Sequence, residues 1–169
     1  MTFKMTSNDS KNSQVGKNGL CFSVKNEKRR DYLEWDEYFM AMTFLELRRG
    51  TPGHIKNAAI ILNQRKIIIS MANSCVLKAD TTSHELHTSH AEYKALEKIQ
   101  QGSVMYTTTF PCDKCAEAVA QAGITEVVFY HKKIDDNRAK EVFDKCGIKY
   151  RQFSTKKRRI ELDFNQFCD

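Results

Sequence analysis

Apolar positions divide the first half of the chain into one helix and one pair of strands. Over residues 32–49 they recur at helical spacing, and Gly50 and Pro52 end the expected helix. Two apolar runs, 58–62 and 67–69, flank a short polar turn. This pattern predicts a β-hairpin, and the continuous apolar character predicts that both faces of its strands are covered.

The second half of the chain alternates between helices and strands. Residues 73–89 are polar and show no clear periodic element. The expected elements after them are a helix at 90–101, a strand at 104–108, a helix at 114–122, a strand at 127–130, a helix at 138–146 and a strand at 148–153. Gly123 and Gly147 close two of these helices. An α-β-α-β-α-β order with short connections predicts an α/β fold, with parallel strands and helices packed on them.

The chain organisation expected from composition is a tail followed by one domain. Residues 1–27 are polar, lack periodicity and predict a mobile tail, which leaves residues 28–169 as a single domain. The sequence has no run of 18 apolar residues, so no membrane span is expected. No apolar stretch follows Lys4, so no secretory signal is visible, and we expect a cytoplasmic or nuclear protein.

Charge and cysteine content leave the class of partner open. The formal net charge is +6, and much of the excess lies in two short runs, 25–30 and 156–159. Such runs are more often solvated faces than nucleic-acid sites, so a polyanionic partner is the secondary interpretation. The six cysteines, in a chain of 169 residues without a secretory signal, predict reduced thiols rather than disulfides.

Two of these thiols have the spacing of a metal site. Cys112 and Cys115 form a Cys-x-x-Cys pair, which lets two thiolates hold one ion from a single helical turn. Pro111 precedes the pair and suits a loop that runs into the start of a helix. The positive end of that helix favours thiolates, which are the form that binds zinc.

A histidine and a glutamate complete a catalytic pattern. His90 and Glu92 stand at the start of the expected helix 90–101, one helix and one strand before the cysteines. His-x-Glu followed by Pro-Cys-x-x-Cys is the signature of zinc deaminases, in which three protein ligands hold the metal. Zinc lowers the pKa of a water molecule, and the carboxylate takes its proton and returns it to the substrate. The sequence predicts this chemistry at C4 of a cytosine.

The same residues permit two other interpretations. A structural zinc site could use His84, His87 or His90 with the two cysteines, and a redox pair would use the cysteines alone. The remaining cysteines and histidines are expected to have packing or surface positions rather than functional roles. We expect Cys146 to be a buried helix residue, Cys75 to be packed rather than to assist a second metal, and the lone histidines His54 and His131 to lie on the surface. Aromatic residues of the first helix are expected in the core.

Several segments resemble deoxycytidylate deaminases, within the cytidine and deoxycytidylate deaminase superfamily. The similarity covers roughly residues 29–165. It lies in the opening helix from Arg30 to Ala41, in the second zinc segment around Met105-Tyr106 and Phe110 to Ala116, and in the helix-to-strand turn Gln121 to Val127.

The resemblance implies a fold, an activity and a site. The fold is the three-layer cytidine deaminase fold, a five-stranded mixed sheet flanked by helices. The activity is hydrolysis of dCMP to dUMP and ammonia by a homo-oligomer, usually a hexamer, with one Zn²⁺ per subunit. His90, Cys112 and Cys115 would hold the zinc, and Glu92 would be the proton shuttle.

Substrate contacts are also implied by the resemblance. Asn73 stands where the family has an asparagine that hydrogen-bonds the sugar, and the Ala91 backbone would touch the base. Asn57 and Phe110 are further candidates for substrate binding. Around Asn57 and Asn73 the chain departs from the family pattern. Two alternatives therefore remain: a deaminase acting on tRNA or single-stranded nucleic acid, and a non-catalytic zinc-stabilised partner of an active deaminase.

Overall fold

The computed structural model describes most of the chain after residue 31, and Leu33 begins one compact unit. The described residues are 32–50, 57–76, 88–99, 101–132, 136–157 and 159–162. The expected tail at 1–27, the basic run at 25–30 and the histidines His54, His84 and His87 lie outside these ranges. None of the described helices has the length and apolar character needed to cross a membrane.

A mixed sheet of five strands forms the centre of this unit, in the order β2-β1-β5-β6-β7. The strands are β1 (Ala58–Leu62), β2 (Ile68–Asn73), β5 (Ser103–Thr109), β6 (Ile124–His131) and β7 (Lys149–Gln152). β1 runs antiparallel to β2 and β5, whereas β5, β6 and β7 are parallel. The expected hairpin, the parallel portion and the five-stranded mixed sheet are therefore confirmed.

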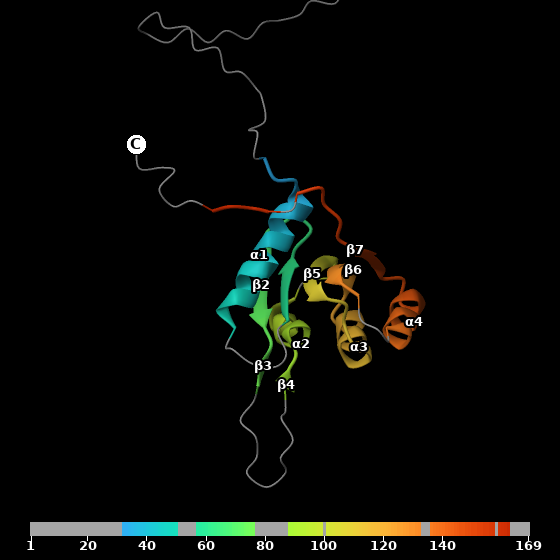
Figure 1. The fold of residues 1–169 in the computed structure, drawn as a ribbon. Helices are drawn as coiled ribbons and strands as arrows, with labels where there is room; N and C mark the ends of the chain where they lie inside the picture. Colours follow the sequence, from blue (N-terminus) through green and yellow to red (C-terminus); the bar gives the residue numbers. More distant parts are fainter. Residues whose placement is uncertain are drawn as a thin grey trace, which may run out of the picture. The chain divides into compact units, whose positions relative to one another are not determined.

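Helices cover both faces of the sheet (Figure 1). They are α1 (Trp35–Arg49), α2 (Ala91–Ala95), which continues as the 3-10 turn η1 (Leu96–Lys98), α3 (Asp113–Gln121) and α4 (Asn137–Lys145). α1 packs with Phe39 and Met40 on one face, while α2, α3 and α4 bury apolar residues against the other. The three-layer α/β fold expected from the resemblance is confirmed.

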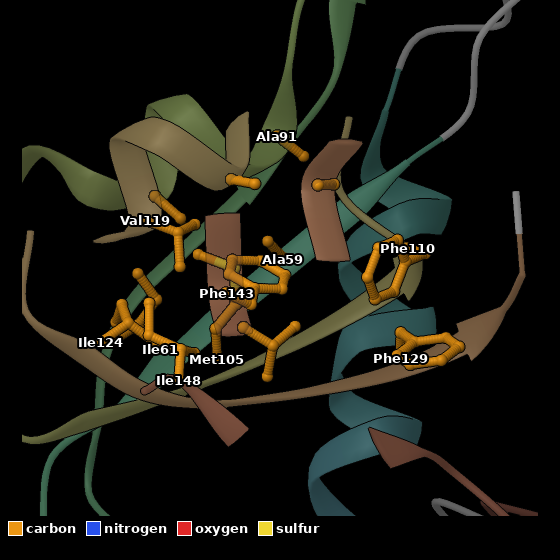
Figure 2. Packing of buried hydrophobic residues seen from close by; sticks show 14 of the residues in the cluster. Ala59, Ile61, Ala91, Met105, Phe110, Val119, Ile124, Phe129, Phe143 and Ile148 are labelled. Carbon is orange, nitrogen blue, oxygen red and sulfur yellow. The ribbon is translucent and has the colours of Figure 1, made fainter. Parts of the chain in front are cut away.

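The core beneath α3 and α4 is built on aromatic contacts (Figure 2). Phe110 and Phe143 are 1% and 0% exposed, and their ring centroids lie 5.8 Å apart at an interplanar angle of 77°. Phe129 packs edge-to-face on Phe110 with a centroid separation of 4.7 Å. Such T-shaped pairs stabilise a core beyond their buried area, by about 0.5–1.5 kcal/mol each. This core holds the start of α3 against the sheet.

Several element boundaries differ from the sequence prediction, and two short strands were not predicted. α1 begins at Trp35 rather than at Tyr32, because the Glu34 side chain caps the helix and the Glu37 carboxylate accepts a hydrogen bond from the Glu34 N–H at 3.0 Å. The helix expected at 90–101 is a shorter α2 followed by η1, and β2 extends beyond residue 69. The segment 73–89 contains two short strands, β3 (Cys75–Val76) and β4 (Thr88–Ser89), which pair with each other.

Coverage of both strand faces in the hairpin holds for one strand only. Every residue of β1 is buried, whereas in β2 Ala72 alone is buried. The reason is position, since β1 lies between β2 and β5 while β2 is the edge of the sheet. The expected helix ends are confirmed, because Gly123 and Gly147 follow α3 and α4 with φ of 79° and 67°.

Candidate active site and metal centre

The start of α2 presents a histidine and a glutamate to the interior. His90 is the residue that caps α2, in extended backbone conformation, and Glu92 lies in the first turn. Ala91 between them is fully buried, and Glu92 is 2% exposed. The first turn of this short helix therefore holds Glu92 in the interior, with His90 half-buried beside it.

The start of α3 presents the two cysteines. Cys112 caps this helix in extended conformation and Cys115 lies in its first turn. Residues three apart on a helix lie on one side, so both thiols face the same point. Cys112 is half-buried and Cys115 is 3% exposed. Both cysteines are free of disulfides, as are Cys75 and Cys146 among the described cysteines.

The three predicted ligand atoms meet with the spacing that zinc requires. His90 Nδ1 lies 3.5 Å from Cys112 Sγ and 3.3 Å from Cys115 Sγ, and all three atoms lie within 4.8 Å of one another. With Zn–N of about 2.0 Å, Zn–S of about 2.3 Å and tetrahedral angles, a nitrogen and a sulfur ligand lie about 3.5 Å apart. Two thiols and an imidazole thus fit a tetrahedral ion with one position open.

Glu92 lies beside this cluster, with one carboxylate oxygen toward Cys115 and the other toward Asn57. Its Oε2 is 3.9 Å from Cys115 Sγ, and its Oε1 accepts a hydrogen bond of 2.8 Å from Asn57 Nδ2. Burial raises the pKa of the Glu92 carboxyl above its ordinary value. A buried carboxyl group adjacent to a three-ligand metal cluster is placed to accept and return a proton.

The predicted substrate-binding residues lie in different surroundings. Asn57 contacts Glu92, as described above, and Ala91 lies beside it with its side chain buried. Asn73 Nδ2 donates to Glu46 Oε1 at 2.8 Å, so its amide is directed to the end of α1. The Phe110 side chain belongs to the aromatic core.

Two residues near the site were not singled out in the sequence. Glu46 is buried at the end of α1, and Thr108 donates its hydroxyl hydrogen to Asn57 Oδ1 from β5. No sequence signal marks either residue, because Glu46 stands among the charged positions of a helix and Thr108 stands within a strand. Their roles follow from strand register and helix packing, which the local pattern does not contain.

The remaining cysteines and histidines divide between confirmation and correction. His131 is exposed, as expected. Cys146 is exposed, so its predicted burial is wrong; α4 ends at Lys145, and Cys146 lies past the last turn of its buried stripe. Cys75 is half-buried with its Sγ 3.7 Å from Lys94 Nζ, and among the described residues it belongs to no cluster of three metal-ligating side chains.

A three-layer α/β sheet that carries a His/Cys/Cys cluster and an adjoining buried glutamate defines a zinc-dependent deaminase. Residues 33–131 match the family model for the cytidine and deoxycytidylate deaminase zinc-binding region. The chain belongs to the cytidine and deoxycytidylate deaminase family, whose metal is zinc.

Similar proteins extend the match beyond the zinc-binding region. Deoxycytidylate deaminase of Homo sapiens is 35% identical in an alignment 164 positions long that covers 84% of this chain and 92% of that protein. The Mus musculus enzyme is 34% identical in an alignment 161 positions long that covers 82% of this chain and 90% of that protein. The structure of dCMP deaminase from cyanophage S-TIM5 in complex with dCMP and dUMP has a TM-score of 0.59 at 20% identity, covering 72% of this chain and 100% of that one. At that identity the structure supports the fold.

Proposed function

We propose that this protein hydrolyses dCMP to dUMP and ammonia. The observation that carries the proposal is the meeting of His90, Cys112 and Cys115 beside the buried Glu92 carboxyl. The choice of dCMP is supported by deoxycytidylate deaminases that are 34–35% identical over 90% or more of their length.

The residues divide the reaction between them. His90 Nδ1 and the thiolates of Cys112 and Cys115 would hold zinc, which lowers the pKa of a water molecule toward neutrality. Glu92 would take one proton from the attacking water and give it to N3 of the cytosine. A second proton, from the oxygen that has become bonded to C4, would pass by way of Glu92 to the amine, which leaves as ammonia. Burial supports this role, because it raises the pKa of the Glu92 carboxyl above its ordinary value and so makes the group a better proton acceptor.

Substrate contacts follow from the positions around Glu92. We propose that the Ala91 backbone contacts the base and that Asn73 contacts the sugar after its amide leaves Glu46. Phe110, buried in the core, would support the loop into α3 rather than touch the nucleotide with its ring. Asn57 differs from the other three candidates because its side chain contacts the Glu92 carboxylate.

The assembly, location and domain bounds are extensions of the same proposal. We propose a homo-oligomer, a hexamer by resemblance, formed by a catalytic domain at 28–169 and located in the cytoplasm or nucleus.

The described part of the basic run 156–159 gives a polynucleotide substrate little support. Lys157 Nζ pairs with Glu37 at 2.7 Å, and Arg159 pairs with Glu161 at 3.3 Å.

The test is ammonia release from a panel of cytosine compounds by Glu92→Gln and its parent. The panel is dCMP, CMP, dCTP, cytidine and a cytosine-containing oligonucleotide. We expect turnover of dCMP, and a loss of about 10²–10⁴-fold in kcat in E92Q at unchanged zinc content. Glu97→Gln is the matched control, since Glu97 is an exposed glutamate on η1, the turn that follows α2.

Three results would decide against the proposal. Turnover by E92Q at the parental rate would remove Glu92 from the mechanism. Release from the oligonucleotide alone, weakened by salt as phosphate contacts are, would assign a polynucleotide substrate instead. No release from any compound at full zinc content would leave a zinc-stabilised partner protein.

A further inference from the structure

The Asn57 amide is held on its oxygen side before it reaches Glu92. Asn57 Oδ1 accepts hydrogen bonds from the Ala58 N–H at 3.0 Å and from the Thr108 hydroxyl, and Thr107 Oγ1 lies 3.5 Å away. Its Nδ2 donates to Glu92 Oε1 at 2.8 Å. Four neighbours on three elements, β1, β5 and α2, thus surround one amide group.

The direction of this amide follows from what its neighbours can do. A backbone N–H is a donor and cannot accept, so the atom facing Ala58 N must be the amide oxygen. The nitrogen is then the atom facing Glu92, and an amide NH₂ can only donate. The contact therefore has one arrangement, in which Glu92 Oε1 is an acceptor.

We propose that Asn57 is a positioning residue that makes the two oxygens of Glu92 unequal, so that Oε2, on the side of the zinc ligands, is the atom that takes and returns the proton. The inference rests on the proposed deaminase function and deepens it. Asn57 acts here through Glu92 rather than through the substrate.

Without such a contact, the two oxygens would be interchangeable. The terminal torsion of a glutamate is broad and nearly two-fold, so a carboxyl group turns easily. The amide donor on Oε1 favours the hydrogen on Oε2, because the carbonyl oxygen of a protonated carboxyl group is a stronger acceptor than its hydroxyl oxygen. Oε2 is also the oxygen 3.9 Å from Cys115 Sγ, beside the metal ligands. Proton transfer then begins and ends at one atom.

The amide is rigid because the sheet fixes it. Asn57 stands directly before β1, and Thr108 belongs to β5, which pairs with β1 in the register Ala59 opposite Thr107. The Asn57 backbone is tied as well, since its N–H donates to Ser74 Oγ at 2.9 Å and its carbonyl accepts from the Ser74 N–H at 2.8 Å. Orientation set in the folded state does not have to be acquired with the substrate.

The test compares Asn57→Ala with two variants of its support. N57A removes the donor to Glu92. Thr108→Val removes the hydroxyl that holds Oδ1 while keeping the side-chain shape, and Thr108→Ser restores the hydroxyl as the conservative control. Ser74→Ala removes a backbone tie and leaves the amide contacts in place. For each protein, kcat and KM for dCMP, zinc content and the midpoint of thermal unfolding are measured.

The expected pattern separates positioning from the other roles. N57A should lose about 10–100-fold in kcat with KM within about two-fold and zinc unchanged, since misplacement of a catalytic group has costs of this order. T108V should lose less, and T108S and S74A should retain kcat. A raised KM at parental kcat in N57A would mean that Asn57 binds substrate and would overturn the inference. Parental kcat per bound zinc in N57A would overturn the inference as well. A loss of kcat in T108V that T108S does not restore would also overturn it.

A readout without turnover separates this inference from the proposed function. The side-chain ¹⁵N–H₂ signals of Asn57 report the donor contact by NMR in the zinc-loaded protein. They should move in Glu92→Ala and should not move in Glu97→Gln. If no compound is deaminated, the proposed function fails. The signals still report whether the Asn57 amide contacts Glu92. Signals indifferent to E92A would overturn the positioning role whatever the activity.

Discussion

Substitution of Asn73 by alanine leaves a buried carboxylate without its hydrogen-bond donor. The Glu46 side chain is 7% exposed, and its Oε1 accepts from Asn73 Nδ2 at 2.8 Å. Glu46 Oε2 has no hydrogen-bond partner in the described part of the chain and lies 3.5 Å from Arg49 Nη1. Arg49 is 78% exposed, so solvent screens its charge and the ion pair cannot replace the donor.

The expected loss in N73A is about 2 kcal/mol in the free energy of unfolding, within the range of about 1.5–3 kcal/mol for hydrogen bonds to charged groups. With a urea slope of about 2 kcal/mol per molar, the unfolding midpoint should fall by about 1 M. Glu46→Gln removes the buried charge but keeps an acceptor for Asn73, so it should change stability by less than about 1 kcal/mol. In the E46Q background, N73A should cost about 1 kcal/mol, the value for a neutral hydrogen bond.

Urea titrations of the two single variants and the double variant provide the coupling free energy. We expect about 1 kcal/mol of coupling between Glu46 and Asn73. N73A with the parental midpoint would refute the argument that the contact stabilises the fold, and strict additivity of the two changes would refute the contribution of the Glu46 charge to that contact. Kinetics of the same proteins address the sugar contact: if Asn73 binds the sugar, N73A raises KM for dCMP and E46Q does not.

Four other substitutions test separate features. Cys112→Ser should lower bound zinc and the thermal midpoint together, measured by metal analysis and calorimetry, and unchanged zinc would exclude this ligand. A side-chain hydrogen bond from Lys157 is the main cause that lowers the Glu37 pKa from 4.5 to about 2. A lowered pKa stabilises the fold above pH 4.5 and the contribution is lost as pH falls toward 2, so Lys157→Met should flatten thermal stability across that window, and an unaltered profile would contradict the linkage. Phe143→Ala should cost about 3–5 kcal/mol in urea unfolding, and a cost under 1 kcal/mol would mean that the core closes over the cavity. Gly147→Ala should cost about 1–2 kcal/mol by backbone strain alone, since φ is 67° and no atom lies within 4 Å of the added Cβ; parental stability would contradict this.

The elements predicted best are those with apolar periodicity on a buried face. β1, with every residue buried, was predicted at its observed bounds, and the glycines after α3 and α4 marked both helix ends. β2 was predicted too short because residues beyond 69 belong to an edge strand, where Ser70 interrupts the apolar run. β3 and β4 escaped detection because two-residue strands have no period.

The local motif predicted some residues of the site, whereas contacts between residues far apart in the sequence were not predicted. His90 and Cys112 each cap a helix, so the motif predicted both the ligand atoms and their elements. The Asn57–Glu92 contact spans 35 residues and depends on the register of β1 and β5, which spacing along the chain does not encode. Sequence reasoning predicted that Asn57 binds the substrate, and the structure shows that its amide contacts Glu92.

The β1–β2 hairpin is closed at both of its ends. At the base, Asn57 and Ser74 exchange two hydrogen bonds, and at the tip Asn63 Oδ1 accepts from the N–H groups of Arg65 and Ile67. The exposed tip lies one strand length from the base, about 16 Å for five residues. Arg65 is therefore a suitable position for attaching a dye or a surface anchor, since a group placed there lies away from the hairpin base and from Glu92, the proposed proton shuttle.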